Sequence, residues 1–171
     1  MTPNELLIKL VNQYDQKNLA YGNSAHRTFC RYGKASYALR LSDKFQRYEN
    51  LIYSPDIPDI GEAIEDTLGD AITYTYMCAA DILCEVMHGE PDPDDTTNMD
   101  KVREMMNLTA CCTEEQINEM AHTFWKNFVD GTDSLVDVIY NMYIDGSTTS
   151  IDYVMLATYL IKLYMERIIR E

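Results

Sequence analysis

The sequence predicts an all-α fold in a single domain that spans residues 1–171. Hydrophobic residues make up 46% of the chain, which is enough for a packed core. The chain has only 7 glycines and 5 prolines, and this scarcity favours helices over a turn-rich β fold. Apolar residues recur at helical spacing in several long segments. We therefore expect a helical bundle.

The N-terminal half is expected to form four helices. A capping box from Thr2 to Glu5 opens the first, which ends near Gly22. Ser24 is the expected N-cap of a short second helix. The third and fourth helices are expected over residues 35–53 and 61–88, and the segment between them contains two prolines, which indicate a loop.

The C-terminal part begins with an acidic, proline-containing loop at residues 90–100. Helical patterns follow over residues 100–108, 113–129, 133–144 and 150–170. Trp125 and Phe128 are expected in the core. Residues 97–171 are expected either to complete the bundle or to form an oligomer interface, and we expect a homo-oligomer.

The formal net charge is −14, which argues against direct binding to duplex nucleic acid, because the phosphate backbone would be repelled. The charge is unevenly distributed, however. Six of the fourteen Lys and Arg residues lie between Arg27 and Arg47, whereas residues 56–70 contain six acids and no base. Such segregation can build a local anion site on an acidic protein.

Two charged stripes stand out on the third and fourth predicted helices. Their members recur at steps of three or four residues, and they are Arg40, Asp43, Lys44 and Arg47 on one helix and Glu62, Asp66 and Asp70 on the other. Packed side by side, the helices would place carboxylates for Mg²⁺ next to cations for phosphate. The alternative is that the basic side chains simply pair with the acidic stripe across the helix interface.

A turn at residues 21–24 precedes the short second helix, and His26 and Arg27 follow it. A helix N-terminus beside arginine side chains can receive a phosphate. The alternative is an ordinary helix–helix connection with exposed arginines. His26 is included as a candidate ligand-binding residue because it lies beside Arg27 in this turn.

The five cysteines are odd in number and form no CxxC motif, which indicates a reducing compartment rather than a disulfide framework or a zinc site. The sequence shows no signal peptide and no apolar run approaching about 18 residues. We therefore expect a cytoplasmic protein without a membrane partner.

Three segments together resemble a phage and prophage family, the nucleotide modification associated domain 1 family. They are the turn Tyr21-Gly22-Asn23-Ser24, an RLxDKxxR pattern from Arg40 to Arg47 and an EDTLxD pattern from Glu65 to Asp70. The resemblance covers roughly residues 12–85, so the motif-bearing core is residues 12–88. It implies a protein of phage or prophage nucleotide metabolism in the cytoplasm of a bacterial host.

That family looks distantly like the all-α MazG-type nucleoside triphosphate pyrophosphohydrolases, which implies a MazG-like bundle with additional C-terminal helices. In those enzymes, ExxE on one helix and ExxD on the next bind Mg²⁺. Asp70 matches the second element, Thr67 stands where its glutamate would be, and Asp66 is a substitute. The first element is missing, and Asp43 is the one acid in the corresponding helix core.

The resulting expectation is Mg²⁺-dependent binding and pyrophosphohydrolysis of a nucleotide, especially a deoxynucleoside triphosphate. Asp66 and Asp70, with Asp43 or Glu62, would hold the metal and activate water. The cations Arg40, Lys44 and Arg47 would stabilise the phosphates. Residues expected near the turn to contact the substrate are Tyr21, Asn23, His26, Arg27 and Phe29. The catalytic set is Asp43, Lys44, Asp66 and Asp70.

Two alternatives remain open at this point. The missing ExxE element favours a non-catalytic nucleotide-binding or sensing protein on the same scaffold. The net charge of −14 also permits an acidic phage accessory protein that acts by protein–protein interaction. The basic residues between 27 and 47 argue against an evenly acidic, DNA-like surface.

Overall fold

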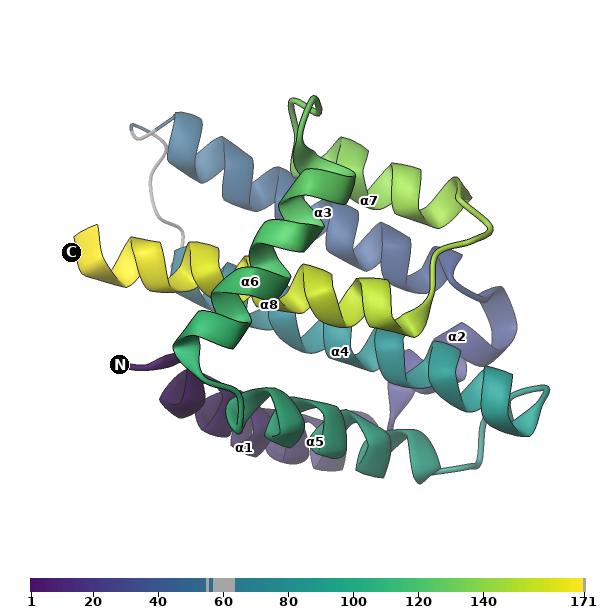
Figure 1. Ribbon diagram of the computed structural model, residues 1–171. Coiled ribbons are helices and arrows are strands. Elements are labelled where there is room, and N and C mark those ends of the chain that lie inside the picture. The colour runs from purple at the N-terminus through teal and green to yellow at the C-terminus, as the bar shows by residue number, and fades with distance from the viewer. Residues whose placement is uncertain (55, 57–63, 171) are drawn as a thin grey trace.

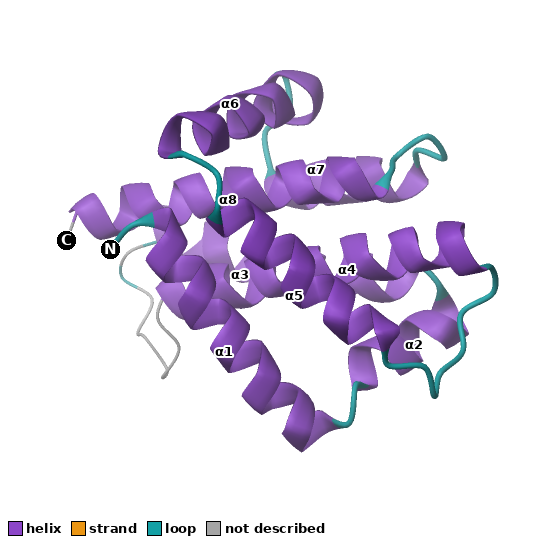
Figure 2. Ribbon diagram, turned by 60° about the horizontal axis from the view of Figure 1, so that its bottom comes forward, coloured by secondary structure: helices purple, strands orange, loops and turns teal. Residues whose placement is uncertain are grey.

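The structure is a computed structural model that describes residues 1–54, 56 and 64–170, and its described elements are all helical (Figures 1 and 2). The all-α prediction is thus confirmed. The elements are α1 (Pro3–Tyr21), α2 (Ser24–Tyr32), α3 (Ala35–Tyr53), α4 (Ile64–His88), α5 (Thr97–Ala110), α6 (Glu114–Phe124), a π-helical turn η1 (Trp125–Val129), α7 (Leu135–Ile144) and α8 (Ser150–Arg170).

Helix α4 lies at the centre of the bundle (Figure 1). It packs against α3, α5 and α8, while α1 lies beside α5, α3 beside α7, and α6 against α8. Every residue from Thr75 to Ile82 is buried. That run is longer than two helical turns, so neighbours cover α4 on all sides there.

The connection between α1 and α2 departs from one expectation. Gly22 ends α1 with a left-handed φ of 60°, and its N–H donates to the Asn18 carbonyl oxygen. Asn23, rather than Ser24, occupies the N-cap position of α2, also at a φ of 60°. Asn tolerates this conformation better than most residues, so the capping prediction for Ser24 was wrong by one residue.

The helix expected over residues 113–129 is not α-helical throughout. It becomes π-helical at Trp125, where the Asp130 N–H donates to the Trp125 carbonyl oxygen five residues earlier. The wider turn changes the direction of the following side chains. Trp125 is 39% exposed and stacks on His122, so its predicted core position was wrong. Phe128 is half-buried and stacks on the buried Phe124.

The C-terminal helices pack against the N-terminal ones. Helix α8 packs along α4 and contributes buried side chains that include Leu156, Leu160 and Tyr164. Helix α7 is fixed to α3 by Glu49, whose Oε1 accepts hydrogen bonds from Ser134 Oγ at 2.9 Å and from the Leu135 N–H at 2.7 Å.

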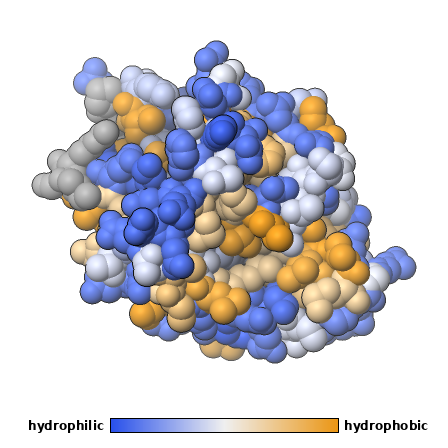
Figure 3. All heavy atoms as spheres, in the orientation of Figure 1, coloured by the Kyte–Doolittle hydropathy of each residue, from blue (hydrophilic) through white to orange (hydrophobic). Residues whose placement is uncertain are grey.

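The face formed by α6 and α8 is mixed in character. Hydrophilic side chains cover α6, while hydrophobic atoms show beside it along α8 (Figure 3). Among the described helices, none combines the length and the apolar character that crossing a membrane requires.

Candidate functional site

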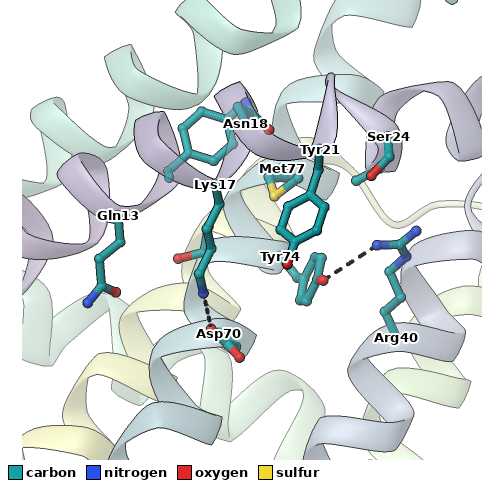
Figure 4. A pocket seen from close by; sticks show the side chains of 12 residues that line it. Gln13, Lys17, Asn18, Tyr21, Ser24, Arg40, Asp70, Tyr74 and Met77 are labelled. Atoms are coloured by element: carbon teal, nitrogen blue, oxygen red, sulfur yellow. Dashed lines mark hydrogen bonds and ion pairs between the residues drawn. The ribbon is translucent and has the colours of Figure 1, made fainter.

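A pocket lies between α1, α3 and α4, next to the start of α2. Its volume is about 220 Å³, and its lining includes Tyr14, Lys17, Asn18, Tyr21, Arg40, Asp70, Tyr74 and Met77 (Figure 4). Tyr21 and Arg40 were predicted to bind substrate and Asp70 to bind metal. The structure therefore brings three predicted site residues from three helices into one cavity.

The spacing of residues along α1 and α4 explains which side chains line the pocket. On α1, Gln13, Lys17 and Tyr21 follow one another at four-residue steps and line one wall. On α4, Asp70, Tyr74 and Met77 do the same on the opposite wall, at steps of four and three. Gly69 lets these walls approach closely, because a Cβ there would lie 3.3 Å from Leu10 Cδ2 of α1.

Asp70 is held by two lysines. Lys17 Nζ lies 2.9 Å from Asp70 Oδ1, and Lys44 Nζ lies 3.1 Å from Asp70 Oδ2. The Lys44 and Asp70 side chains are 24% and 27% exposed, so water screens this pair less than it screens a fully exposed one. The basic stripe of α3 thus meets the acidic stripe of α4, and lysine supplies the countercharge. Lys17 was not predicted to belong to the site.

Arg40 lies over the ring of Tyr74. Its guanidinium carbon is 5.4 Å from the ring centroid, and one guanidinium nitrogen lies 3.4 Å from the Tyr74 hydroxyl oxygen. A guanidinium at this distance from an aromatic face gains a cation–π attraction. The contact holds Arg40 on the side of the pocket opposite Lys17 in the view of Figure 4.

The remaining described residues of the two stripes do not line this pocket. Arg47 donates from Nε to Thr67 Oγ1 at 3.2 Å, and Asp43 is exposed on α3. Asp66 is exposed and lines a neighbouring depression of about 290 Å³ that Lys17 and Asp70 also border. Glu62 lies outside the described residues.

The described residues do not fit a magnesium site well. Mg²⁺ binds carboxylate oxygens, yet each oxygen of Asp70 lies within 3.1 Å of a lysine nitrogen. Within residues 1–54, 56 and 64–170, no three His, Cys, Asp or Glu side chains form a group that could hold a metal ion. The Mg²⁺ site and the catalytic roles of Asp43, Lys44, Asp66 and Asp70 therefore stay predictions.

The turn after α1 places its residues differently from the expectation. The side-chain amides of Asn23 and Asn98 exchange two hydrogen bonds of 3.1 Å inside the protein. Arg27 lies on the surface beside Asp94, at 3.3 Å. Phe29 is buried against Tyr37. Neither Asn23 nor Phe29 lines the pocket, because Asn23 bonds to Asn98 and Phe29 packs on Tyr37.

His26 belongs to a buried network that the sequence did not reveal. Its Nδ1 lies 2.7 Å from Asp81 Oδ1, and its Nε2 lies 2.8 Å from the Asp92 carbonyl oxygen. Tyr37 donates its hydroxyl hydrogen to the other oxygen of Asp81. The side chains of His26 and Asp81 are 5% and 1% exposed. Protein groups therefore contact both ring nitrogens of His26, which does not line the pocket, and its contact with substrate stays a prediction.

The network makes stability depend on pH. The Asp81 carboxylate raises the pKa of His26 above its ordinary 6.5, because it accepts a hydrogen bond from the charged imidazolium. The stabilisation is fully present below pH 6.5 and is lost as the pH rises through the folded-state pKa. The free energy of unfolding, measured in urea, should therefore fall as the pH rises above about 6.5.

His26→Gln is the control, since it keeps a polar side chain but does not titrate. The other two histidines are present in both proteins, so the difference between the two pH dependences reports on His26. If the free energy of unfolding falls with pH no more steeply for the wild-type protein than for His26→Gln, the ion pair is contradicted.

Fold and pocket together define an acidic, all-helical protein with a pocket that carries cations and tyrosines. Comparisons of the chain with family models, with curated proteins and with solved structures found no match. The resemblance to the nucleotide modification family therefore rests on the sequence motifs alone.

Proposed function

We propose that this protein binds a nucleotide in the pocket between α1, α3 and α4. One observation carries the proposal: Lys17 and Arg40 flank two tyrosine rings in a cavity of a chain whose net charge is −14. Lys44 adds a third cation through its pair with Asp70. Cations there would attract phosphate, and aromatic rings would stack on a base.

The size and lining of the pocket indicate which part of a nucleotide each side chain would contact. Its volume of about 220 Å³ is below the roughly 300–1,000 Å³ of whole small-molecule sites, so it would enclose one part of a nucleotide. Tyr21 is 68% exposed and Tyr74 is half-buried, and both line the cavity. We place the base against these rings and the phosphates toward the amine of Lys17 and the guanidinium of Arg40.

Binding, rather than hydrolysis, is the function that the described residues support. Pyrophosphohydrolysis of the MazG type would need Mg²⁺ at Asp70, where two lysines already neutralise the carboxylate and would compete with the metal. Without a metal, the lysines, Arg40 and the tyrosines can hold a nucleotide but supply no activated water. The non-catalytic alternative is therefore the one that we carry forward.

Calorimetric titration of the wild-type protein with deoxynucleoside mono-, di- and triphosphates tests this proposal, in Mg²⁺ and in EDTA. Release of phosphate and pyrophosphate is measured on the same samples. We expect binding in both buffers and no release. Mg²⁺-dependent release would overturn the binding-only function and establish a hydrolase. An absence of binding to every nucleotide would overturn the proposal and direct the search to a macromolecular partner.

Asp70→Asn distinguishes the two roles of this carboxylate. As a partner of lysines, Asp70 opposes phosphate, so its neutralisation should tighten nucleotide binding about fivefold, or ~1 kcal/mol, at low salt. As a metal ligand, its loss should instead abolish Mg²⁺-dependent binding or release. Asp66→Asn is the matched control one helical turn away, and it should change affinity much less because Asp66 does not line the pocket.

A further inference from the structure

Two buried polar atoms in the wall of this pocket have no hydrogen-bond partner among the described residues. They are the Tyr14 hydroxyl oxygen and the Asn18 side-chain nitrogen, Nδ2. Tyr14 is 2% exposed and Asn18 is 9% exposed. Both residues line the pocket.

Unpartnered polar atoms of this kind are costly, because they lose their bonds to water and gain nothing in return. Elsewhere in the same part of the bundle, buried polar groups are paired: the amides of Asn23 and Asn98 bond to each other, and Asp81 accepts from His26 and Tyr37. The hydroxyls of Tyr76 and Thr148 are also unpartnered, but only Tyr14 and Asn18 of these four residues line this cavity, where a ligand would supply the missing partner.

The side chains of Tyr14 and Asn18 lie on the same side of α1. They are four residues apart, so their side chains lie one above the other on one face of the helix. Asn18 Nδ2 can only donate. Burial raises the pKa of Tyr14 to about 12, against a smaller lowering by a weak contact with the Asn18 side chain, so its hydroxyl keeps its hydrogen and can donate as well.

On the basis of the proposed nucleotide binding, we infer that Tyr14 and Asn18 recognise a carbonyl oxygen of the base. A carbonyl oxygen has two lone pairs and can accept from both donors together, whereas a ring nitrogen has one. Uracil, thymine, cytosine and guanine carry such an oxygen, and adenine does not. An asparagine alone can pair with adenine, but the Tyr14 hydroxyl would then stay without an acceptor. The pocket therefore selects carbonyl-bearing bases over adenine.

Titrations of the full chain with dUMP, dCMP, dGMP, dAMP and base-free deoxyribose 5-phosphate test this inference. We expect at least one carbonyl-bearing nucleotide to bind about tenfold more tightly than dAMP, in line with a hydrogen bond that adenine cannot accept. Tyr14→Phe should weaken that nucleotide about five- to tenfold and leave dAMP unchanged. Asn18→Leu should reduce the preference in the same way.

Thermal unfolding of the ligand-free protein separates recognition from a structural role. The Tyr14 hydroxyl has at most a weak contact with the Asn18 side chain, so Tyr14→Phe should change the melting temperature little. Tyr76→Phe is the matched control: it also removes a buried, unpartnered hydroxyl, but Tyr76 does not line the pocket. It should leave every nucleotide affinity unchanged.

The outcomes distinguish this inference from the proposed function. If deoxyribose 5-phosphate or dAMP binds as tightly as the other nucleotides, the phosphate site stands and the recognition of a carbonyl is overturned. Recognition of a carbonyl is also overturned if Tyr14→Phe and Asn18→Leu leave the preference for carbonyl-bearing nucleotides over dAMP unchanged. If no probe binds to the wild-type protein, the proposed function fails and the inference fails with it.

Discussion

Asp81→Ala is expected to lower the free energy of unfolding by about 3–5 kcal/mol, the range found when one partner of a buried ion pair is removed. Asp81 is 1% exposed and accepts hydrogen bonds from His26 and Tyr37. Its loss leaves the buried Nδ1–H of His26 and the buried Tyr37 hydroxyl without an acceptor. Urea unfolding at about pH 6, where His26 is charged, measures the effect.

The matched control is Asp94→Ala. Asp94 also pairs with a cationic side chain of α2, Arg27, but its side chain is 80% exposed. Its removal should cost less than about 1 kcal/mol because water screens the pair. If Asp81→Ala lowers the free energy of unfolding no more than Asp94→Ala does, the buried network is contradicted. Replacing His26 and Asp81 together with leucine should restore part of the stability, because no buried charge is then left unpaired.

Arg40→Met is expected to weaken nucleotide binding by about 10- to 100-fold, since hydrogen bonds to charged groups contribute about 1.5–3 kcal/mol each. Methionine keeps an unbranched apolar stem beside Tyr74 and removes the charge. The ligand-free protein should lose only about 0.5–1 kcal/mol, which is the magnitude of an exposed cation–π contact. Titration with the tightest nucleotide, followed by thermal unfolding, measures both quantities.

Arg31→Met is the control for charge alone. Arg31 belongs to the same basic segment, but it is exposed on α2 and does not line the pocket. Its replacement should change affinity by less than about threefold at 0.15 M salt, because charges beyond about 8 Å are largely screened there. Equal losses for the two variants would show that the overall charge attracts the ligand and that the pocket does not hold it.

The fold class was predictable because local signals agree with the tertiary structure. The Thr2 capping box and Gly22 mark both ends of α1, and the α3 bounds match the expected 35–53. The α5 start was missed by three residues, since α5 begins at Thr97 rather than at residue 100. The π-helical turn at Trp125 has no comparable signal in the sequence.

The candidate site was predictable only in part. Helical periodicity identified the stripes whose members Lys44 and Asp70 meet across the interface of α3 and α4. It did not identify Lys17, which comes from α1 and lies 53 residues away from Asp70 in the chain. Asp81 was a detectable exception, as an acid inside the apolar run of α4, but its partners His26 and Tyr37 depend on long-range packing.

The position of α8 against α4 has a consequence for synthesis. The chain emerges from the ribosome N-terminus first, so the helices that form the pocket are made before the helix that covers their core. Residue 164 follows residue 88 by 76 residues. At about 5–20 residues per second, one side of α4 stays uncovered for roughly 4–15 s. Chaperones that bind exposed apolar helices have this interval in which to act.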